Sequence, residues 1–316
     1  MTAPLEYCLA AYEAYLKNER CMTERSVRDY LWSATFLCAR LNPVTVSSYK
    51  EINDVIREMK ERENWSQGTV YKYSICVKNF FKWLYRERYR QDNPYPFAEW
   101  RKPRPHTPRF LTQIQFSQIV DDPHLTHQEQ TILHTFWDSA ARLSEVEHLT
   151  QDDFFFDVKF FLDDARQIET HGHYVRIRYE ISKGNYSYRN VPITETLKEM
   201  LKRQFQFARN RGHHQSVFLS HNNEPITDSG ISKLLYNIGM RQSPLRPQMH
   251  LSAHMFRHSF GIRMLEKDIP QVIVQKWLGH QSLDMTSHYV NMAAENSMRI
   301  FRQRLSQNRE SIPLSA

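Results

Sequence analysis

Five prolines packed into residues 94–108 constrain the fold more than any other feature of the sequence. Proline lacks a backbone N–H donor and its ring blocks the preceding helical turn, so no helix continues through this stretch. The chain also has 316 residues, more than a single hydrophobic core usually organises. We therefore expect two domains, at residues 1–96 and 110–316, joined by a linker at 97–109.

The segment before the linker has the periodicity of helices only. Apolar residues recur at intervals of three and four over residues 5–16, 27–41, 52–59 and 70–85. Thr23 and Ser66 precede the second and fourth of these segments, and both are residue types that cap helix N-termini. The pattern predicts a small four-helix domain.

The segment after the linker combines helical and extended patterns. Alternating apolar and polar residues predict strands at 174–179 and 190–193, on either side of a polar turn that contains Gly184. Helical periodicity occurs at 112–120, at 128–140 and, with a break near Gly279, from 228 to 307. The sequence predicts a mainly α-helical fold class with a small antiparallel β-sheet in the second domain.

Basic residues concentrate around the linker. The formal net charge is +7, and between Lys72 and Arg109 ten Lys and Arg residues stand against three Asp and Glu. This excess suggests a polyanionic partner such as double-stranded DNA, and a solvated helix face followed by a basic linker fits it about equally well. The candidate DNA-binding residues are Lys72, Lys78, Lys82, Arg86, Arg101, Lys102 and Arg104.

Glycine and cysteine usage argues against several classes of site. The chain has eight glycines and neither a GxGxxG nor a GxxxxGK motif, so no nucleotide cofactor held by such a loop is expected. The four cysteines form no CxxC pair, which disfavours a disulfide framework and fits a reducing cytoplasm. No apolar run approaches the roughly 18 residues of a membrane span, so we expect no membrane partner.

A cluster of basic side chains occurs in the segment HMFRHSF. On a helix, His254, Arg257 and His258 share one face, because positions three and four apart are neighbours. The spacing of the two histidines also occurs in HExxH zinc sites, but Met255 replaces the glutamate and no third ligand lies close by in sequence. Arginine presents a planar, permanently charged fork to phosphate oxygens, so the segment favours a phosphate site without a metal.

Three further segments carry residues of related chemistry. Arg142 and Glu145 lie near a predicted helix start, Lys183 lies at the mouth of the polar turn, and Tyr289 follows His280 by nine residues. Each feature alone is common on a protein surface or in a core. Together with HMFRHSF they supply charge, acid, base and nucleophile for phosphoryl transfer without a metal or other cofactor.

These segments resemble the boxes of the tyrosine recombinase family, the lambda-integrase-like and Xer-like recombinases. ARLSEV resembles the first arginine box, HMFRHSF the HxLRHSF box, and LGHQSLDMTSHYV the LGH…Y box with matching spacing. KGNYSYRNVPI resembles the hairpin that carries the lysine of the family. The N-terminal helices are similar to the core-binding domain of the family, so the resemblance covers nearly the whole chain.

The resemblance implies a role for each candidate residue. Tyr289 would attack the scissile DNA phosphate and form a 3′-phosphotyrosyl bond, while Arg142 and Arg257 would clamp that phosphate. Lys183 would protonate the leaving 5′-oxygen, and His254 would act as general base toward the tyrosine.

Three more residues complete the implied site. His280 would hydrogen-bond the phosphate in the transition state, Glu145 would orient its neighbours, and His258 would support the site. The sequence departs from the family at Ser139-Ala140-Ala141, where Thr-Gly is common, and in a hairpin between Lys183 and Arg189 that is about one residue longer.

The resemblance also implies partners. Two domains would form a C-shaped clamp around a duplex recombination site, and four protomers would synapse two sites as a homotetramer. The tail 296–305, which has apolar residues at helical spacing, would pack on a neighbouring protomer or on its own domain. We expect a cytoplasmic, nucleoid-associated recombinase; a type IB topoisomerase and an inactive DNA-binding accessory protein are the alternatives.

Overall fold

The computed structural model describes residues 5–41, 47–62, 64–93, 108–163, 168–178, 188–280 and 289–290. The chain divides into two compact units, at Met1–His106 and Thr107–Ala316. In the described residues no helix has both the length and the apolar character needed to cross a membrane.

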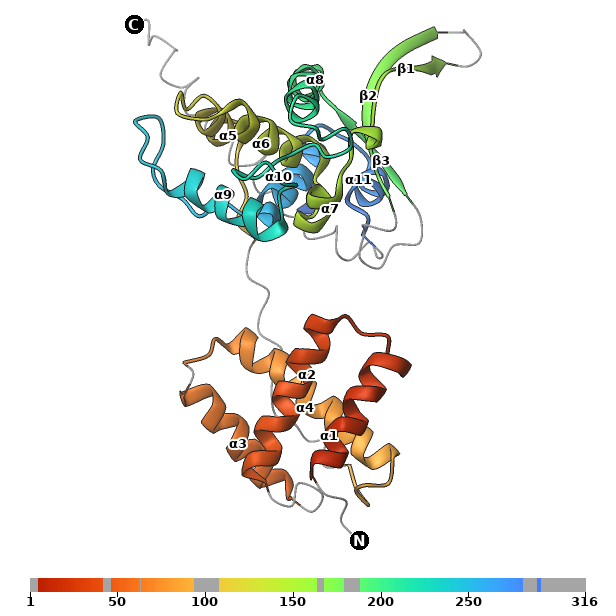
Figure 1. The fold of residues 1–316 in the computed structure, drawn as a ribbon, viewed down its shortest axis with the longest axis vertical. Coiled ribbons are helices and arrows are strands. Elements are labelled where there is room, and N and C mark those ends of the chain that lie inside the picture. The colour runs from red at the N-terminus through yellow and green to blue at the C-terminus, as the bar shows by residue number, and fades with distance from the viewer. Residues whose placement is uncertain are drawn as a thin grey trace, which may run out of the picture. The chain divides into compact units, whose positions relative to one another are not determined.

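The first unit consists of helices (Figure 1), which pack around a core rich in aromatic side chains. Its helices are α1 (Leu5–Ala14), which continues as a π-helical turn (Tyr15–Glu19), α2 (Glu24–Arg40), α3 (Tyr49–Arg62) and α4 (Gln67–Arg86). Tyr12, Phe80 and Trp83 lie buried against one another, with ring centroids of Tyr12 4.9 Å from Phe80 and 5.0 Å from Trp83.

In this unit the sequence predicted two helix starts correctly and one helix end incorrectly. The side chains of Thr23 and Ser66 accept hydrogen bonds from the backbone N–H groups of Ser26 and Thr69, as expected of N-caps. The first helix, expected to end at Leu16, instead runs on as the π-helical turn.

The second unit contains the remaining helices and the sheet (Figure 1). Its helices are α5 (Gln113–Val120), α6 (His127–Ser139), α7 (Leu143–His148), a 3₁₀ turn (Gln151–Asp153), α8 (Glu195–Arg209), α9 (Asp228–Met240), α10 (Ala253–Glu266) and α11 (Gln271–Leu278). Its strands are β1 (Phe154–Asp163), β2 (Ile168–Ile177) and β3 (Arg189–Ile193).

The three described strands form an antiparallel sheet in the order β1-β2-β3. Val175 at its centre pairs with Phe154 on one side and Val191 on the other. The sequence did not predict β1, because its phenylalanine-rich run lacks the alternation of a half-buried strand and because its register shifts between Phe155 and Val158. Strand β2 begins at Ile168, earlier than the expected residue 174, because its first half pairs with β1, which the sequence did not predict.

Helix α10 lies at the centre of the second unit. Its Phe256, Phe260 and Ile262 are buried, and it packs against α6, whose Ile132 and Phe136 are fully buried. Figure 1 shows α10 among α5, α6 and α11. Since α10 also carries the HMFRHSF segment, the core fixes the backbone from which the candidate site projects.

Candidate active site

Arg142 is held at the start of α7 by the end of α6. Ala140, which follows α6, has a left-handed backbone (φ 50°) that turns the chain so that Arg142 becomes the N-cap of α7. Glu145 accepts from the Arg142 backbone N–H (2.7 Å, Oε2) and from Arg142 Nη1 (2.8 Å, Oε1). Arg142 Nη2 donates to the carbonyl of Gly279 (3.1 Å), and its side chain keeps 24% of its surface exposed.

Arg257 is buried and is held by two helix ends. Its Nη1 donates to the carbonyl of Ala140 (2.9 Å), and its Nη2 donates to the carbonyl of Leu278, the last residue of α11. Carbonyl groups at a helix C-terminus lack intrahelical partners and carry partial negative charge. The ends of α6 and α11 therefore fix Arg257 through backbone carbonyls, whereas Arg142 is held by the carboxylate of Glu145 and the carbonyl of Gly279.

Tyr289 lies against α10. Its hydroxyl is 2.9 Å from Nδ1 of His258, its ring centroid is 6.0 Å from that of His280, and only 4% of the residue is exposed. The ring occupies the space beside Gly261, where a β-carbon would lie 2.8 Å from Cδ2 of the tyrosine. The imidazole that contacts the hydroxyl is therefore His258; His254, which resemblance suggested as the base, is exposed, with its ring centroid 6.5 Å from that of His258.

Arg189 is a residue of this site that the sequence analysis missed. It is 8% exposed, and it donates to both carboxylate oxygens of Glu145 (3.1 Å from Nη1 and 2.6 Å from Nη2) and to the carbonyl of Trp277 (2.7 Å from Nε). A signal was present, since Arg189 occupies an inward position in the alternation of β3 with Val191 and Ile193. A charged side chain at such a position requires a buried partner.

The electrostatic field of the site is cationic. Among the described residues, the fully buried carboxylate of Glu145 contacts the guanidinium groups of Arg142 and Arg189, and Arg257 acts on it by its charge. Burial would raise the pKa of Glu145, but hydrogen bonds and charges from Arg189 and Arg142 outweigh it and lower that pKa to about 2. The excess of positive charge suits an anionic substrate group.

The same field keeps the imidazoles neutral near pH 7. Burial, His254 and Arg257 lower the pKa of His258 to about 4, and burial with the charges of Arg257 and Arg142 lowers the pKa of His280 to about 3. Although part of the His254 side chain is exposed, desolvation of its ring by the packed neighbours and the charges of the same two arginines lower the pKa of His254. Burial raises the pKa of Tyr289, so in the free protein a protonated phenol lies beside a neutral imidazole.

The described structure does not place every predicted residue in this cluster. Lys183, the linker residues Arg101, Lys102 and Arg104, and the tail 296–305 lie outside the described residues. The basic residues of α4 belong to the other unit: Lys72 pairs with Asp29 (2.7 Å) and Arg86 with Glu19 (3.2 Å) and Glu87 (2.6 Å). No group of three or more side chains suited to hold a metal ion occurs among the described residues.

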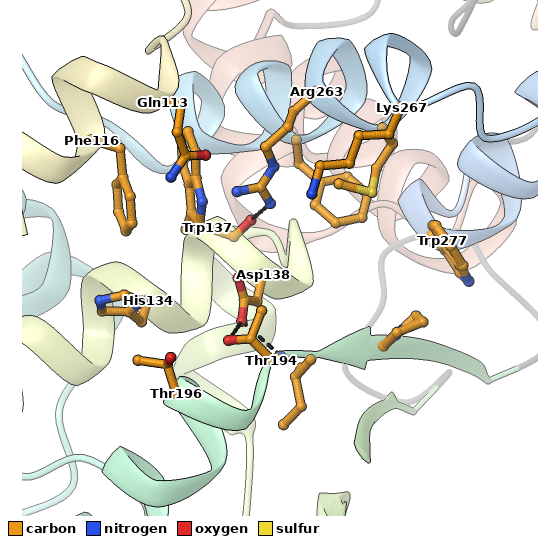
Figure 2. A pocket seen from close by; sticks show the side chains of 14 residues that line it. Gln113, Phe116, His134, Trp137, Asp138, Thr194, Thr196, Arg263, Lys267 and Trp277 are labelled. Atoms are coloured by element: carbon orange, nitrogen blue, oxygen red, sulfur yellow. Dashed lines mark hydrogen bonds between the residues drawn. The ribbon is translucent and has the colours of Figure 1, made fainter. Parts of the chain in front are cut away.

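A separate pocket of about 400 Å³ lies on the second unit (Figure 2). Arg263 of α10 and Lys267, which follows that helix, line it together with Trp137 and Asp138 of α6. None of the candidate catalytic residues lines it. It adjoins the site through Trp277, a wall residue whose carbonyl accepts from Arg189.

A model of the phage integrase family matches residues 109–296, which include the arginines, the histidines and Tyr289 of the cluster. The chain belongs to the phage integrase family. This match confirms the expected tyrosine recombinase family and the expected enzyme class.

Individual proteins are similar to this chain over most of its length. Tyrosine recombinase XerC of Bacillus subtilis (strain 168) is 25% identical over 292 residues, covering 89% of this chain and 90% of XerC. The Tn1549 transposon integrase in complex with transposon right end DNA has a TM-score of 0.67 at 18% identity and covers 97% of this chain and 100% of that one. A lambda integrase dimer bound to a COC′ core site has a TM-score of 0.66 at 15% identity, covering 90% and 77%. These likenesses confirm the mainly α-helical class with a small antiparallel sheet.

Proposed function

We propose that this protein is a site-specific DNA recombinase that cuts and rejoins strands through a 3′-phosphotyrosine intermediate, without metal or ATP. The observation that carries the proposal is the 2.9 Å hydrogen bond between the Tyr289 hydroxyl and a neutral His258, on the helix that also carries Arg257. A phenol beside an uncharged imidazole is an activated nucleophile, and the neighbouring guanidinium groups suit a phosphodiester.

In the proposed cleavage step the Tyr289 oxygen forms a bond to phosphorus and the bond from phosphorus to the 5′-oxygen breaks. The phenol proton passes to His258, and Lys183 donates a proton to the departing 5′-oxygen. Arg142 and Arg257 stabilise the negative charge that grows on the non-bridging oxygens, and His280 hydrogen-bonds one of them. The released strand has a free 5′-hydroxyl.

Rejoining is the reverse of cleavage with a different strand. A 5′-hydroxyl gives its proton to Lys183 and attacks the phosphotyrosine, the bond from phosphorus to the Tyr289 oxygen breaks, and the tyrosine recovers its proton from His258. Because one phosphate ester replaces another, the energy of the phosphodiester bond is retained in the intermediate. No nucleotide hydrolysis is needed.

The proposal extends to assembly on DNA. The first unit supplies exposed basic residues on α4, and the solved relatives include an integrase in complex with transposon end DNA and a lambda integrase dimer on a core site. We propose that the domains 1–96 and 110–316, joined by the linker 97–109, close around duplex DNA. Four protomers then synapse two sites, with the tail 296–305 packed on a neighbour. Deleting residues 295–316 should therefore abolish synapsis. Unchanged synapsis after this deletion would mean that the tail packs on its own domain.

A nicked suicide duplex tests the cleavage step. A bound site is first selected from randomised duplexes, then nicked beside the scissile phosphate so that a short product diffuses away and religation fails. In buffer with EDTA we expect an adduct that survives SDS, and we expect Tyr289→Phe to bind the duplex but form none. Relaxation of supercoiled DNA without sequence preference would point instead to a topoisomerase.

Two comparisons test the proton transfers. His258→Ala should slow adduct formation more than His254→Ala, by about 100-fold or more, because general-base catalysis contributes roughly 10²–10⁴-fold. Lys183→Ala should cleave the ordinary duplex slowly, because no lysine protonates the departing 5′-oxygen. A duplex with sulfur in place of that oxygen should restore its rate, since a thiolate leaves without a proton. A slower rate of adduct formation in His254→Ala than in His258→Ala would assign the role of general base to His254.

A further inference from the structure

Arg189 shares the carboxylate of Glu145 with Arg142. Oε1 accepts from Nη1 of Arg142 (2.8 Å) and Nη1 of Arg189 (3.1 Å), while Oε2 accepts from the Arg142 backbone N–H (2.7 Å) and Nη2 of Arg189 (2.6 Å). The carboxylate therefore lies between two guanidinium groups. Its position decides where Arg142 points.

The two arginines differ in what they can reach. The Arg142 side chain is 24% exposed, whereas the Arg189 side chain is 7% exposed and its Nε is bound to the carbonyl of Trp277. Arg142 can meet a substrate from this position, while Arg189 supports the carboxylate from within the protein.

Arg189 also joins three elements. It begins β3, it binds Glu145 of α7, and through Trp277 it binds the last turn of α11. The neighbouring carbonyls of Leu278 and Gly279 accept from Arg257 and Arg142. The buried guanidinium of Arg189 thus connects the groups that hold Arg142, which is partly exposed, with those that hold Arg257, which is buried.

We propose that Arg189 is a positioning residue for DNA cleavage, which fixes Glu145 and, through it, the guanidinium of Arg142. The inference rests on the proposed function. A bidentate fork is suited to this role because it fixes the plane of the carboxylate as well as its distance, which a lysine does not.

Single-turnover cleavage of the suicide duplex tests the inference. Arg189→Met should lower the rate of adduct formation by about 100-fold while duplex binding stays within a few-fold, because a displacement of about 1 Å at a positioned group costs on the order of 10²-fold. Arg189→Lys should be intermediate, since it keeps the charge and loses the fork. Arg178→Met is the matched control: Arg178 pairs with Asp153 (2.7 Å) beside the same sheet and should keep the wild-type rate within about twofold.

A pH profile separates positioning from a purely structural role. The charged groups that act on Glu145 are Arg142 of α7, Arg189 of β3 and, more weakly, Arg257 of α10. Without Arg189, burial raises the pKa of Glu145, because among the described residues that form hydrogen bonds to it Arg142 is then the arginine left to oppose this shift. The rate of cleavage by Arg189→Met should then fall as the pH drops from 7 to 5. The wild type should show no such fall, which we call the acidic limb of the pH profile. Arg189→Met/Glu145→Gln should be slow at every pH, with no limb.

The outcomes are distinguishable from failure of the proposed function. The wild type must form the adduct in each experiment, and its failure would contradict the proposed function instead. Wild-type rates in both Arg189 variants, or a slow rate without the acidic limb in folded Arg189→Met, would overturn the inference. If circular dichroism shows that Arg189→Met is unfolded, Arg189→Lys decides by its rate and pH profile.

Discussion

At the scale of single residues, Gly261 sets where the nucleophile rests. A β-carbon at this position would lie 2.8 Å from Cδ2 and 3.1 Å from Cε2 of Tyr289. We expect Gly261→Ala to displace the ring and slow adduct formation by about 10–100-fold, as a misplaced reacting group does. The free energy of unfolding should change by less than about 2 kcal/mol, because overpacking is partly offset by the helix propensity of alanine.

Gly68→Ala serves as the control for that substitution. Gly68 lies in the first turn of α4, and the nearest atom to its β-carbon would be 3.8 Å away, an ordinary contact. Cleavage should be unchanged in this variant. An unchanged rate in Gly261→Ala would mean that Tyr289 leaves this position before it attacks.

At the scale of elements, the end of α6 determines how Arg257 is held. Ala140 is fully buried with φ 50°, a conformation that costs an L-residue about 1–2 kcal/mol. Ala140→Val adds a β-branch there without space for it, and we expect a loss of roughly 2–4 kcal/mol in the free energy of unfolding, measured by urea denaturation. Ala140→Gly, which adopts this backbone without strain, should stay within about 1 kcal/mol of the wild type. Equal stability of the valine variant would contradict this account.

The sequence predicted elements whose signals are local. The caps at Thr23 and Ser66 and the shared face of His254, Arg257 and His258 follow from residue type and helical spacing alone. Strand β1 was missed because its pairing with β2, which is not local, determines it. Arg189 was missed for the same reason, since its partner Glu145 lies 44 residues away.

The contact of Tyr289 with His258 instead of His254 also depends on packing. Both histidines share a face of α10, so helical spacing does not distinguish them. The placement of the tyrosine ring beside Gly261 brings its hydroxyl to His258.

At the scale of the whole molecule, DNA binding should depend on the unpaired basic residues of α4. Lys78 and Lys82 are exposed four residues apart and have no acidic partner among the residues that the structure describes, whereas Lys72 pairs with Asp29. Replacing Lys78 and Lys82 with alanine should reduce the slope of log K against log salt by about 1 for each DNA phosphate that the variant no longer neutralises. Lys72→Ala is the control and should change the slope less. Equal effects would show that the ion pair with Asp29 opens on DNA.

Stability of the second unit should fall in mild acid. The pKa values of His258 (about 4) and His280 (about 3) lie below that of an unfolded histidine, so below pH 6.5 the unfolded chain binds more protons and unfolding is favoured. Between pH 7 and 4.5 these rings should account for about 1–3 kcal/mol, after allowance for solvent screening of half-buried groups. Urea unfolding of His258→Asn/His280→Asn should show a smaller loss over this range. An equal loss would assign the acid sensitivity to other groups.

The most direct measurement identifies the atom that becomes joined to DNA. The adduct formed on the suicide duplex in EDTA is digested with nuclease and trypsin, and the peptide 277–299, which contains Tyr289, is sequenced by mass spectrometry. We expect this peptide to carry a nucleotide linked through its 3′-phosphate to the phenol oxygen of Tyr289. A nucleotide on any other residue, or an adduct that persists in Tyr289→Phe, would contradict the account.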